Sequence, residues 1–552
     1  MSKDRVEEYL GKRDWRIQEN ANSNYCYQSL ISHVAGAAIA EHTLETVYPE
    51  YIAEMHRSGD LHIHDLSNGI IPYCAGWSFM DLLLKGFQGG PGRLRSAPAK
   101  HLDSVLAQLM NFLITLQGEW AGAQAINSFD TFLAPFVRAD NLTYEQVRQD
   151  IQRFVFMLNT GMRLGQASFT NITLDWNCPK DLKDTPVIIG GEPHEEWTYG
   201  DFPEEMAMVN RAFLEVMLEG DADGRIFSFP IPTYSMTPEF DWESENALLL
   251  FRAAGRYGLP YFQNFISSDR DPSEVRSMCC RLQLSLKDLR HKGGGLFGSG
   301  DKTGSLGVVT LNLPRIALRV HLEGGGKEAF YEDLDGVLHA AVESLEIKRE
   351  VVTRNFENGL MPYSKIYLGT LDNHFHTIGT IGMHEMCMNF LRKGIETEEG
   401  REFALEVLDH IRGRLQDLQE NTGHLYNLEG VPGEGTSYRL AKRDEEIYGD
   451  RGYYSGKGTP YYTNSSQLPV GYTDDLFEAL QHQDELQCSY TGGTVFHAYL
   501  GEHIDDPATV GRLIRKVFEN FKMPYFSLTP TFSICPVHGY IPGDHETCPY
   551  ED

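Results

Sequence analysis

Short runs of strand-forming residues alternate with helical patterns along most of this 552-residue chain. The runs at 226–229, 307–311 and 365–368 join β-branched or aromatic residues to other apolar ones. Between and after them, residues 334–349 and 401–419 repeat apolar positions at helical spacing. This alternation predicts an α/β architecture, because helices that separate successive strands usually cover a shared sheet.

A further helical pattern covers residues 100–117 and is strongly apolar on one face. A face of this kind usually packs in a core, although it can also build a dimer interface. Both interpretations stay open for this amphipathic helix. The residues that form the face are Leu102, Val105, Leu106, Leu109, Met110, Leu113 and Leu116.

Charge excludes several classes of partner. The chain has 48 basic and 78 acidic residues, a formal net charge of −30, which repels nucleic acid and anionic membrane surfaces. A local pocket can still bind a small anion such as a nucleotide. The N-terminus has no apolar signal segment, and no run approaches the roughly 18 apolar residues of a membrane span. Nine scattered cysteines indicate reduced thiols, so we expect a cytoplasmic protein.

An adjacent cysteine pair, Cys279 and Cys280, indicates redox or radical chemistry. Neighbouring cysteines rarely bridge to each other, because their Cβ vectors diverge along the backbone. The next residue, Arg281, can favour a thiolate or hold an anionic substrate. Free cysteines are also often small buried apolar residues, and the pair alone does not decide between the two interpretations.

Three glycine-rich loops, at 291–300, 430–435 and 490–494, allow the backbone to approach a ligand closely. Together they suggest a site the size of a nucleotide, although any single loop of this kind most often only turns the chain. The third loop contains Gly492, Gly493 and Thr494, which we expect to open a helix over 494–501 and to direct free N–H groups at a triphosphate. Arg439 and Lys442 lie near a second glycine loop, where they either add positive charge to the site or form a solvated surface pair.

Two further groups of residues have the spacing of metal ligands. Cys535, His538, His545 and Cys548 form two incomplete knuckles that resemble a zinc ribbon, so a structural zinc is plausible. His62 and His64 alternate as on one face of a strand. No third ligand is evident near them, which favours a role in lining or supporting a substrate pocket.

Many ordered motifs spread over about five hundred residues identify a family. With them, the chain resembles the oxygen-sensitive, anaerobic class III ribonucleoside-triphosphate reductases, which are glycyl-radical enzymes. The motifs are Asp14–Arg16, Glu19–Asn22, Gly59–Leu66, Pro72–Cys74, Phe169–Asn171, Phe229–Thr233, Met278–Arg281, Gly307–Arg315, Gly435–Arg439, Thr463–Gln467 and Thr491–Thr494.

The resemblance implies a ten-stranded α/β barrel made of two half-barrels, with a central finger loop that carries the radical cysteine. In this chain the barrel would occupy residues 1–530, and residues 531–552 would form a partial zinc ribbon at the start of the glycyl-radical domain. Motif alignment assigns Cys280 as the thiyl that abstracts the ribose 3′-hydrogen and Cys74 as the second, reducing cysteine. The two sulfurs must face one sugar from opposite sides.

The resemblance also implies a set of residues around the substrate and the zinc. The expected substrate-binding residues are His64, Asn171, Cys279, Arg281, Ser305, Asn312, Arg439, Gly492, Gly493 and Thr494. The expected zinc ligands are Cys535, His538 and Cys548.

The chain departs from the family at three places. The catalytic motifs begin by residue 14, so we expect no N-terminal ATP-cone and no on-off switch by ATP and dATP. Several members carry an asparagine, linked to formate use, near the position of Ser305. Because this chain has serine there, two reductants stay open: formate and a thioredoxin-like protein. The family's radical glycine follows the zinc ribbon, whereas this sequence ends at Asp552. Truncation, a split gene and loss of radical function would each explain that, and Gly471 is a superficial match only.

From this resemblance we expect an enzyme that reduces ribonucleoside triphosphates to 2′-deoxyribonucleoside triphosphates for DNA synthesis and repair. The enzyme would form a homodimer and respond to ATP or deoxynucleotide effectors, and the 100–117 helix is a candidate scaffold for that control. It would need a radical-SAM iron-sulfur activase to make its glycyl radical. Two alternatives stay open: a non-catalytic nucleotide-binding paralogue, and another glycyl-radical enzyme acting on a small carbon substrate.

Overall fold

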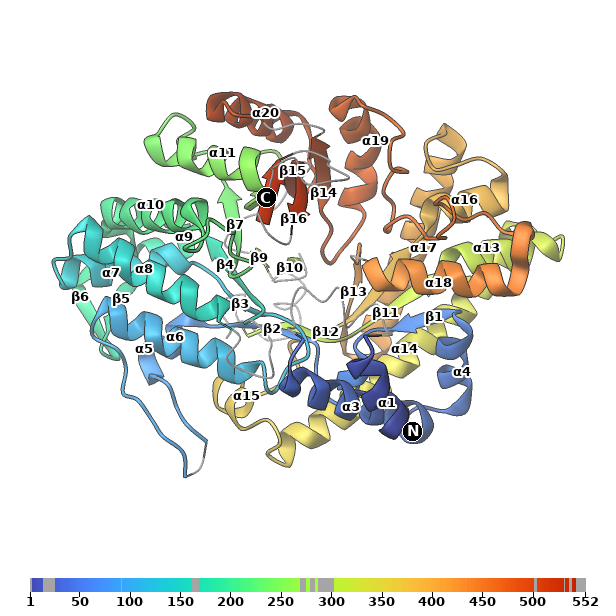
Figure 1. Ribbon diagram of the computed structural model, residues 1–552, viewed down its shortest axis with the longest axis horizontal. Helices are drawn as coiled ribbons and strands as arrows, with labels where there is room; N and C mark the ends of the chain where they lie inside the picture. The colour runs from blue at the N-terminus through green and yellow to red at the C-terminus, as the bar shows by residue number, and fades with distance from the viewer. Residues whose placement is uncertain are drawn as a thin grey trace.

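Ten strands form a ring at the centre of the molecule, and helices surround it (Figure 1). The computed structural model describes residues 2–12, 25–90, 92–160, 168–268, 275–277, 283–285, 302–431, 433–500, 504–530, 532–535 and 539–542. The strand order is β13-β12-β11-β2-β3-β4-β7-β8-β15-β14, and β1 pairs with β11 beside this path. The strands are β1 Leu61–Ile63, β2 Cys74–Trp77, β3 Gln124–Ile126, β4 Thr170–Leu174, β7 Ile231–Met236, β8 Tyr261–Asn264, β11 Gly304–Asn312, β12 His374–Ile381, β13 Leu425–Glu429, β14 Phe496–Leu500 and β15 Tyr525–Pro530.

The ring consists of two parallel halves that run in opposite directions. In the first half, β2, β3, β4, β7 and β8 are mutually parallel. In the second half, β11, β12 and β13 are parallel to one another, and β14 is parallel to β15. The halves meet through antiparallel pairs, β11 with β2 and β15 with β8. The predicted ten-stranded barrel of two half-barrels is therefore confirmed.

Backbone hydrogen bonds join the two ends of this strand order. The Gly430 N–H donates to the Gly493 carbonyl at 2.7 Å, and the Gly492 N–H donates to the Leu428 carbonyl at 2.7 Å. These bonds connect the end of β13 to the segment that leads into β14. They complete the ring, so that the barrel has no open edge between its first and last strands.

Side chains alternate between the helices outside the barrel and its interior, as the pleat of a strand requires. On β4, Ile172 and Leu174 belong to the large apolar core between strands and helices, whereas Asn171 and Thr173 lie on the opposite face. Helices cover the outside because the strands of each half are parallel and need crossover connections. The main covering helices are α5 Phe79–Lys85, α6 Leu102–Leu116, α7 Phe129–Ala139, α8 Tyr144–Asn159, α10 Pro203–Glu219, α11 Glu245–Tyr257, α13 Leu313–Leu322, α14 Lys327–Glu357, α16 Met383–Leu391, α17 Glu398–Thr422, α18 Glu434–Tyr448, α19 Leu476–Cys488 and α20 Pro507–Asn520.

Several predicted elements are confirmed. The run at 307–311 lies in β11, and the patterns at 334–349 and 401–419 lie in α14 and α17. The apolar pattern at 100–117 is α6, whose apolar face is buried in the core. That face is used for packing inside the chain, and so it is not free to build a dimer interface.

Two predicted strands are wrong. Residues 226–229 have no regular structure, and β7 begins only at Ile231, after Pro230, which has no N–H to donate to a ladder. Residues 365–368 lie at the helix α15, Pro362–Tyr367, rather than in a strand. Proline at the first helical position favours a helix start. The Glu119 carboxylate, distant in sequence, accepts the N–H groups of Tyr363 and Ser364 and stabilises that start.

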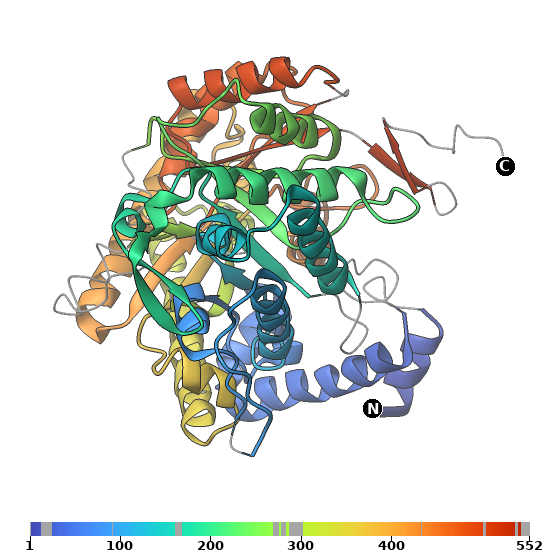
Figure 2. The ribbon, with the colours of Figure 1, turned by 90° about the vertical axis from the view of Figure 1, so that its left-hand side faces the viewer.

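Three two-stranded hairpins in the described residues stand apart from the ring. The first pairs β5 Pro186–Ile189 with β6 Glu192–Thr198. The strands β9 Val275–Ser277 and β10 Gln283–Ser285 pair with each other antiparallel, and in the view of Figure 1 they lie inside the ring of strands. The strands β16 Phe532–Cys535 and β17 Gly539–Pro542 form a hairpin that projects from the side of the barrel (Figure 2). Among the helices of the described residues, we find none with the length and apolar character needed to span a membrane.

Candidate active site in the barrel

Cys74 lies on the inner wall of the barrel, at the seam between the two halves. It begins β2, is fully buried, and pairs in register with Ser305 of β11 although 231 positions separate the two in sequence. The side chain packs in a small apolar cluster that is separate from the outer core. The other buried members of this cluster are Ala123, Ala125, Phe375 and Leu425. The seam therefore brings two predicted site residues together on one wall.

Ser305 is held by a second hydroxyl that the sequence did not single out. The Ser305 Oγ lies 2.8 Å from the Oγ1 of Thr377 on β12, and it also donates to the Gly307 carbonyl at 3.1 Å. A register shift of β11 between Ser305 and Gly307 accompanies this arrangement. Thr377 in turn pairs with Asn427 of β13. Cys74, Ser305, Thr377 and Asn427 thus follow one another across four neighbouring strands.

The hairpin β9–β10 connects the barrel to the predicted radical cysteine. Its register pairs Ser277 with Gln283, so residues 278–282 join the two strands. Cys279, Cys280 and Arg281 belong to this connection and lie outside the described residues. A hairpin with the cysteine pair between its strands has the connectivity of the expected finger loop.

Polar side chains line the interior along both halves of the barrel. The Asn171 Nδ2 donates to the Ile231 carbonyl at 2.9 Å and to the Thr233 Oγ1 at 3.3 Å. Other polar atoms are buried and have no hydrogen-bond partner among the described residues. They are Asn171 Oδ1, Thr173 Oγ1, Gln263 Nε2, Asn427 Nδ2 and Asn427 Oδ1. Buried polar groups are normally paired, so this distribution indicates an interior built for a polar ligand.

The predicted helix over 494–501 is wrong. Residues 496–500 form β14, which pairs in parallel with β15. Gly492 and Gly493 use their backbone groups to close the ring, and a Cβ on Gly492 would lie 3.0 Å from the Leu428 carbonyl oxygen. The Thr494 hydroxyl donates to the Gln487 side chain. The loop therefore has no helix N-terminus to offer a triphosphate, and its glycines are explained by the close approach of two backbones.

The two predicted histidines lie together near the far end of β11. His62 and His64 have ring centroids 4.7 Å apart, edge to face. The Arg439 guanidinium lies 3.0 Å from the His62 Nδ1, and the His64 Nε2 lies 2.8 Å from the Thr310 Oγ1. This arrangement brings His64 and Arg439, both predicted substrate contacts, to one place. The neighbouring arginine cation disfavours a metal ion here.

Asn312 has a structural role. Its Oδ1 accepts the Arg315 N–H at 3.2 Å and caps helix α13, and its Nδ2 donates to the Gly59 carbonyl and to Asp444. Arg315 and Asp444 form an ion pair that is almost completely buried. The hydrogen bonds of Asn312 are thus made within the protein, in a network that fixes α13 and α18 against the barrel.

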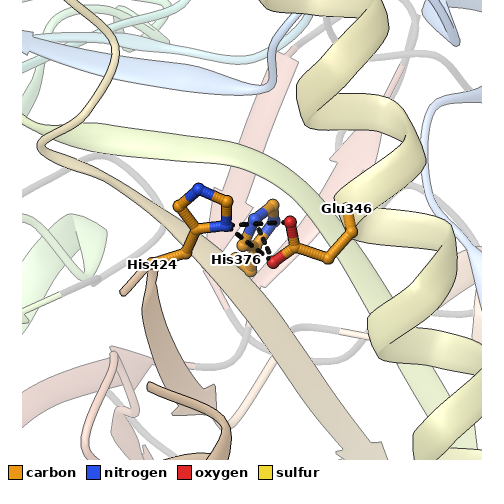
Figure 3. Close-up of side chains that lie close together, drawn as sticks. All are labelled: Glu346, His376 and His424. Carbon is orange, nitrogen blue, oxygen red and sulfur yellow. Dashed lines mark hydrogen bonds and ion pairs between the residues drawn. The ribbon is translucent and has the colours of Figure 1, made fainter. Parts of the chain in front are cut away.

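A cluster of Glu346, His376 and His424 on the outer side of β12 and β13 resembles a metal site (Figure 3). The His424 Nδ1 lies 2.8 Å from the Glu346 Oε2, and the His376 Nε2 lies 3.3 Å from the Glu346 Oε1. The Arg349 Nε, however, donates to the same His376 Nε2 at 2.8 Å. A metal at this nitrogen would face a guanidinium cation, so we interpret the cluster as a hydrogen-bond network that ties α14 to the strands.

Burial shifts the pKa of two histidines on β12. Burial lowers the pKa of His374 to about 3, and the Arg349 charge adds to the shift. Burial also lowers the pKa of His376 to about 4, with Arg349 adding to the shift and Glu346 opposing it. A histidine that stays neutral in the folded protein does not change the free energy of unfolding above about pH 6.5. As the pH falls from 6.5 towards the pKa of the folded state, that free energy decreases, because only the unfolded chain takes up the proton.

Replacing His374 by phenylalanine is therefore expected to make the protein more resistant to acid. Each of these histidines should cost the wild type about 2–3 kcal/mol between about pH 6.5 and about pH 4.5, because the unfolded chain takes up a proton that the fold excludes. Melting temperatures near neutral pH and near pH 5 measure the effect. An equal loss of melting temperature in the variant and the wild type would contradict this account of His374.

A surface hollow of about 670 Å³ lies between α6 and α8, away from the barrel interior. Its lining includes the carboxylates of Asp103, Asp140, Glu145 and Asp150, against the single arginine Arg153. This balance disfavours an anionic nucleotide, and so we do not assign the hollow to an effector.

The structure describes no side chain of the predicted zinc ligands. Cys535 ends β16, at the closed end of the β16–β17 hairpin. His538 and Cys548 lie outside the described residues. A zinc site at this hairpin stays a prediction.

Sequence comparison places the chain beside a known group of enzymes. A family model described as anaerobic ribonucleoside-triphosphate reductase matches residues 19–550. A curated anaerobic ribonucleoside-triphosphate reductase of Enterobacteria phage T4 is 25% identical over 524 residues, which cover 88% of this chain and 81% of the phage protein. The protein of the same name from Escherichia coli strain K12 is 24% identical over 492 residues, covering 82% of this chain and 66% of its own length.

Structure comparison finds the same fold. The crystal structure of the anaerobic ribonucleotide reductase from Thermotoga maritima in complex with dATP and CTP has a TM-score of 0.77 at 20% identity, over 98% of this chain and 89% of that one. Another structure of that protein, with glycerol in the active site, has a TM-score of 0.78 at 21% identity, over 99% of this chain and 89% of that one.

Proposed function

Because the chain belongs to the anaerobic ribonucleoside-triphosphate reductase family, we propose that Cys74 and Cys280 together reduce ribonucleoside triphosphates to 2′-deoxyribonucleoside triphosphates inside the barrel. The observation that carries this proposal is the position of Cys74. It is buried on the inner wall at the seam of the two half-barrels, in register with Ser305. The β9–β10 hairpin, with Cys280 in its connection, supports it.

Each cysteine has a distinct role in the proposed reaction. The family's glycyl radical, which we propose is made by a radical-SAM activase, supplies the unpaired electron. Cys280 gives its S–H hydrogen to that radical and, as a thiyl, takes the 3′-hydrogen of the ribose as an S–H bond forms and the C–H bond breaks. The 2′-hydroxyl then leaves as water with the proton of the 3′-hydroxyl, which leaves a 3′-keto sugar with a radical on the 2′ carbon. In our proposal the Cys74 thiol gives its hydrogen atom to that carbon. The external reductant supplies two electrons and two protons, one of each to restore the Cys74 thiol and one of each to convert the ketone to a 3′ radical that carries a hydroxyl. Cys280 finally returns its hydrogen to the 3′ carbon.

The source of the two electrons depends on the residue beside Cys74. Ser305 stands there, and its hydroxyl already bonds to Thr377 and to the Gly307 carbonyl. A hydroxyl that already makes these hydrogen bonds is a poorer hydrogen-bond donor to a formate ion than an amide side chain without partners would be. We therefore propose a dithiol protein of the thioredoxin type as the reductant, with formate as the alternative.

Nucleotides are proposed as effectors as well as substrates. The Thermotoga maritima relative has been solved with dATP and CTP bound together. In this chain we propose Asn171, Ser305, His64 and Arg439 as substrate contacts, because their side chains lie on or beside the barrel wall. Zinc at Cys535, His538 and Cys548, and a homodimer, are proposed from the family alone.

Turnover of the protein as its native host makes it tests this function. After anaerobic activation by the activase, and with a dithiol protein or formate supplied, each ribonucleoside triphosphate is incubated and its 2′-deoxy product is quantified. We expect product with at least one reductant. Tight nucleotide binding without any product, in a protein that forms no radical after treatment with the activase, would instead favour the non-catalytic paralogue.

A further inference from the structure

Asn427 of β13 has a buried side-chain amide. Its side chain is only 2% exposed. Among the residues that the structure describes, neither its Nδ2 nor its Oδ1 has a hydrogen-bond partner. An unpaired amide in a protein interior costs about 1–3 kcal/mol for each group left unsatisfied, so an apolar residue of the same size would be favoured if folding alone mattered.

The amide points into the barrel and not towards the helices. Residues on the two sides of Asn427, Tyr426 and Leu428, pack in the outer core with α14 and α17. Leu425, which shares the face of Asn427, packs in the inner cluster with Cys74. The pleat of the strand therefore places Asn427 on the same wall as Cys74, next to Thr377.

The backbone of the neighbouring glycine, Gly492, packs close to the buried amide. A Cβ on Gly492 would lie 3.3 Å from both the Cγ and the Nδ2 of Asn427. Any larger residue at this position would crowd the amide. Glycine at position 492 therefore serves two purposes: it allows the closure of the ring, and it leaves the side chain of Asn427 uncrowded.

We propose that Asn427 binds the ribose of the substrate, with its amide exchanging hydrogen bonds with a sugar hydroxyl; this inference rests on the proposed function. A hydroxyl both donates and accepts, so it satisfies a donor and an acceptor that lie side by side. A phosphate group only accepts and would place its negative charge against the Oδ1. The position of Asn427, on the wall that Cys74, Ser305 and Thr377 share, is also where a sugar held by Cys74 would lie.

The test combines an amide deletion with deletions of the hydroxyl. Dissociation constants are measured for a ribonucleoside triphosphate and for its 2′-deoxy and 3′-deoxy analogues, with the wild type, Asn427→Ala and the nearly isosteric Asn427→Leu. We expect the wild type to bind the ribonucleotide about tenfold more tightly than the analogue that lacks the contacted hydroxyl, and both variants to bind the two equally. The variants should also melt at or above the wild-type temperature, since they lose an unpaired buried amide.

Asn389→Ala provides a matched control. Asn389 is fully buried too, but its Nδ2 donates to the Pro314 carbonyl at 3.1 Å and its Oδ1 accepts the Tyr453 N–H at 2.8 Å. This variant should melt at a lower temperature and keep the wild-type preference for the ribonucleotide. The two asparagines thus separate a structural amide from a ligand-binding one.

Two results would overturn the inference. If the Asn427 variants keep the full wild-type discrimination between ribonucleotide and analogues, the amide does not contact a hydroxyl. If they lose affinity for every nucleotide equally and melt at a lower temperature, Asn427 holds the barrel together or contacts another part of the ligand. Failure of the wild type to bind any ribonucleoside triphosphate would instead count against the proposed function itself.

Discussion

Cys280→Ser is expected to abolish the formation of deoxyribonucleotide while leaving nucleotide affinity within about twofold of the wild type. A serine O–H bond is much stronger than a thiol S–H bond, so a serine cannot form the radical that exchanges hydrogen with the ribose. The expected fall in turnover is at least about a thousandfold. Product is measured anaerobically after activation, and affinity is measured by equilibrium binding.

The exposed cysteine Cys488, at the end of α19, provides the control for this prediction. Cys488→Ser should retain full turnover, because the residue lies outside the barrel interior. Substantial product from Cys280→Ser would contradict the assignment of the hydrogen-abstracting sulfur. An equal loss of turnover in Cys488→Ser would show that replacing any cysteine lowers activity, and that the loss in Cys280→Ser is not specific to this sulfur.

Cys74→Ser is expected to separate hydrogen abstraction from reduction. The variant should still exchange the 3′-hydrogen of a bound ribonucleotide, because that step depends on Cys280. It should form at least about a thousandfold less deoxyribonucleotide, because the second sulfur is missing when the sugar must be reduced. Isotope release from substrate labelled at the 3′ position and product formation are measured on the same sample.

Cys387, on α16, is the matched control because it is another fully buried cysteine and lies in the outer core. Cys387→Ser should cost a similar amount of thermal stability and leave both isotope exchange and product formation intact. If Cys74→Ser also loses isotope exchange, then Cys74 is needed before the sugar radical forms and our assignment of its role is wrong.

Local apolar patterns in the sequence predicted the α/β architecture, and the resemblance to the family predicted the barrel. The α/β alternation was correct at β11, α14 and α17. Cys74 and Ser305 were both identified from motifs, yet only the antiparallel seam shows that they are partners in register. Pairing between strands far apart in the chain leaves no periodic signal in either strand.

The errors have the same physical origin. Residues 494–501 look like the start of a helix after a glycine turn, but β15 and the end of β13 supply backbone partners that favour a strand there. Residues 365–368 look like a strand, but the carboxylate of Glu119 caps a helix. Thr377 and Asn427 were missed because an inward polar residue becomes significant only once the ring has closed around it.

A crystal structure of the anaerobically prepared protein with a bound ribonucleoside triphosphate would test the central claim most directly. We expect the ribose inside the barrel, with the sulfurs of Cys74 and Cys280 in van der Waals contact with it, about 4 Å away, on opposite faces. A nucleotide bound outside the barrel, or a ribose with only one of the two sulfurs in contact, would contradict it.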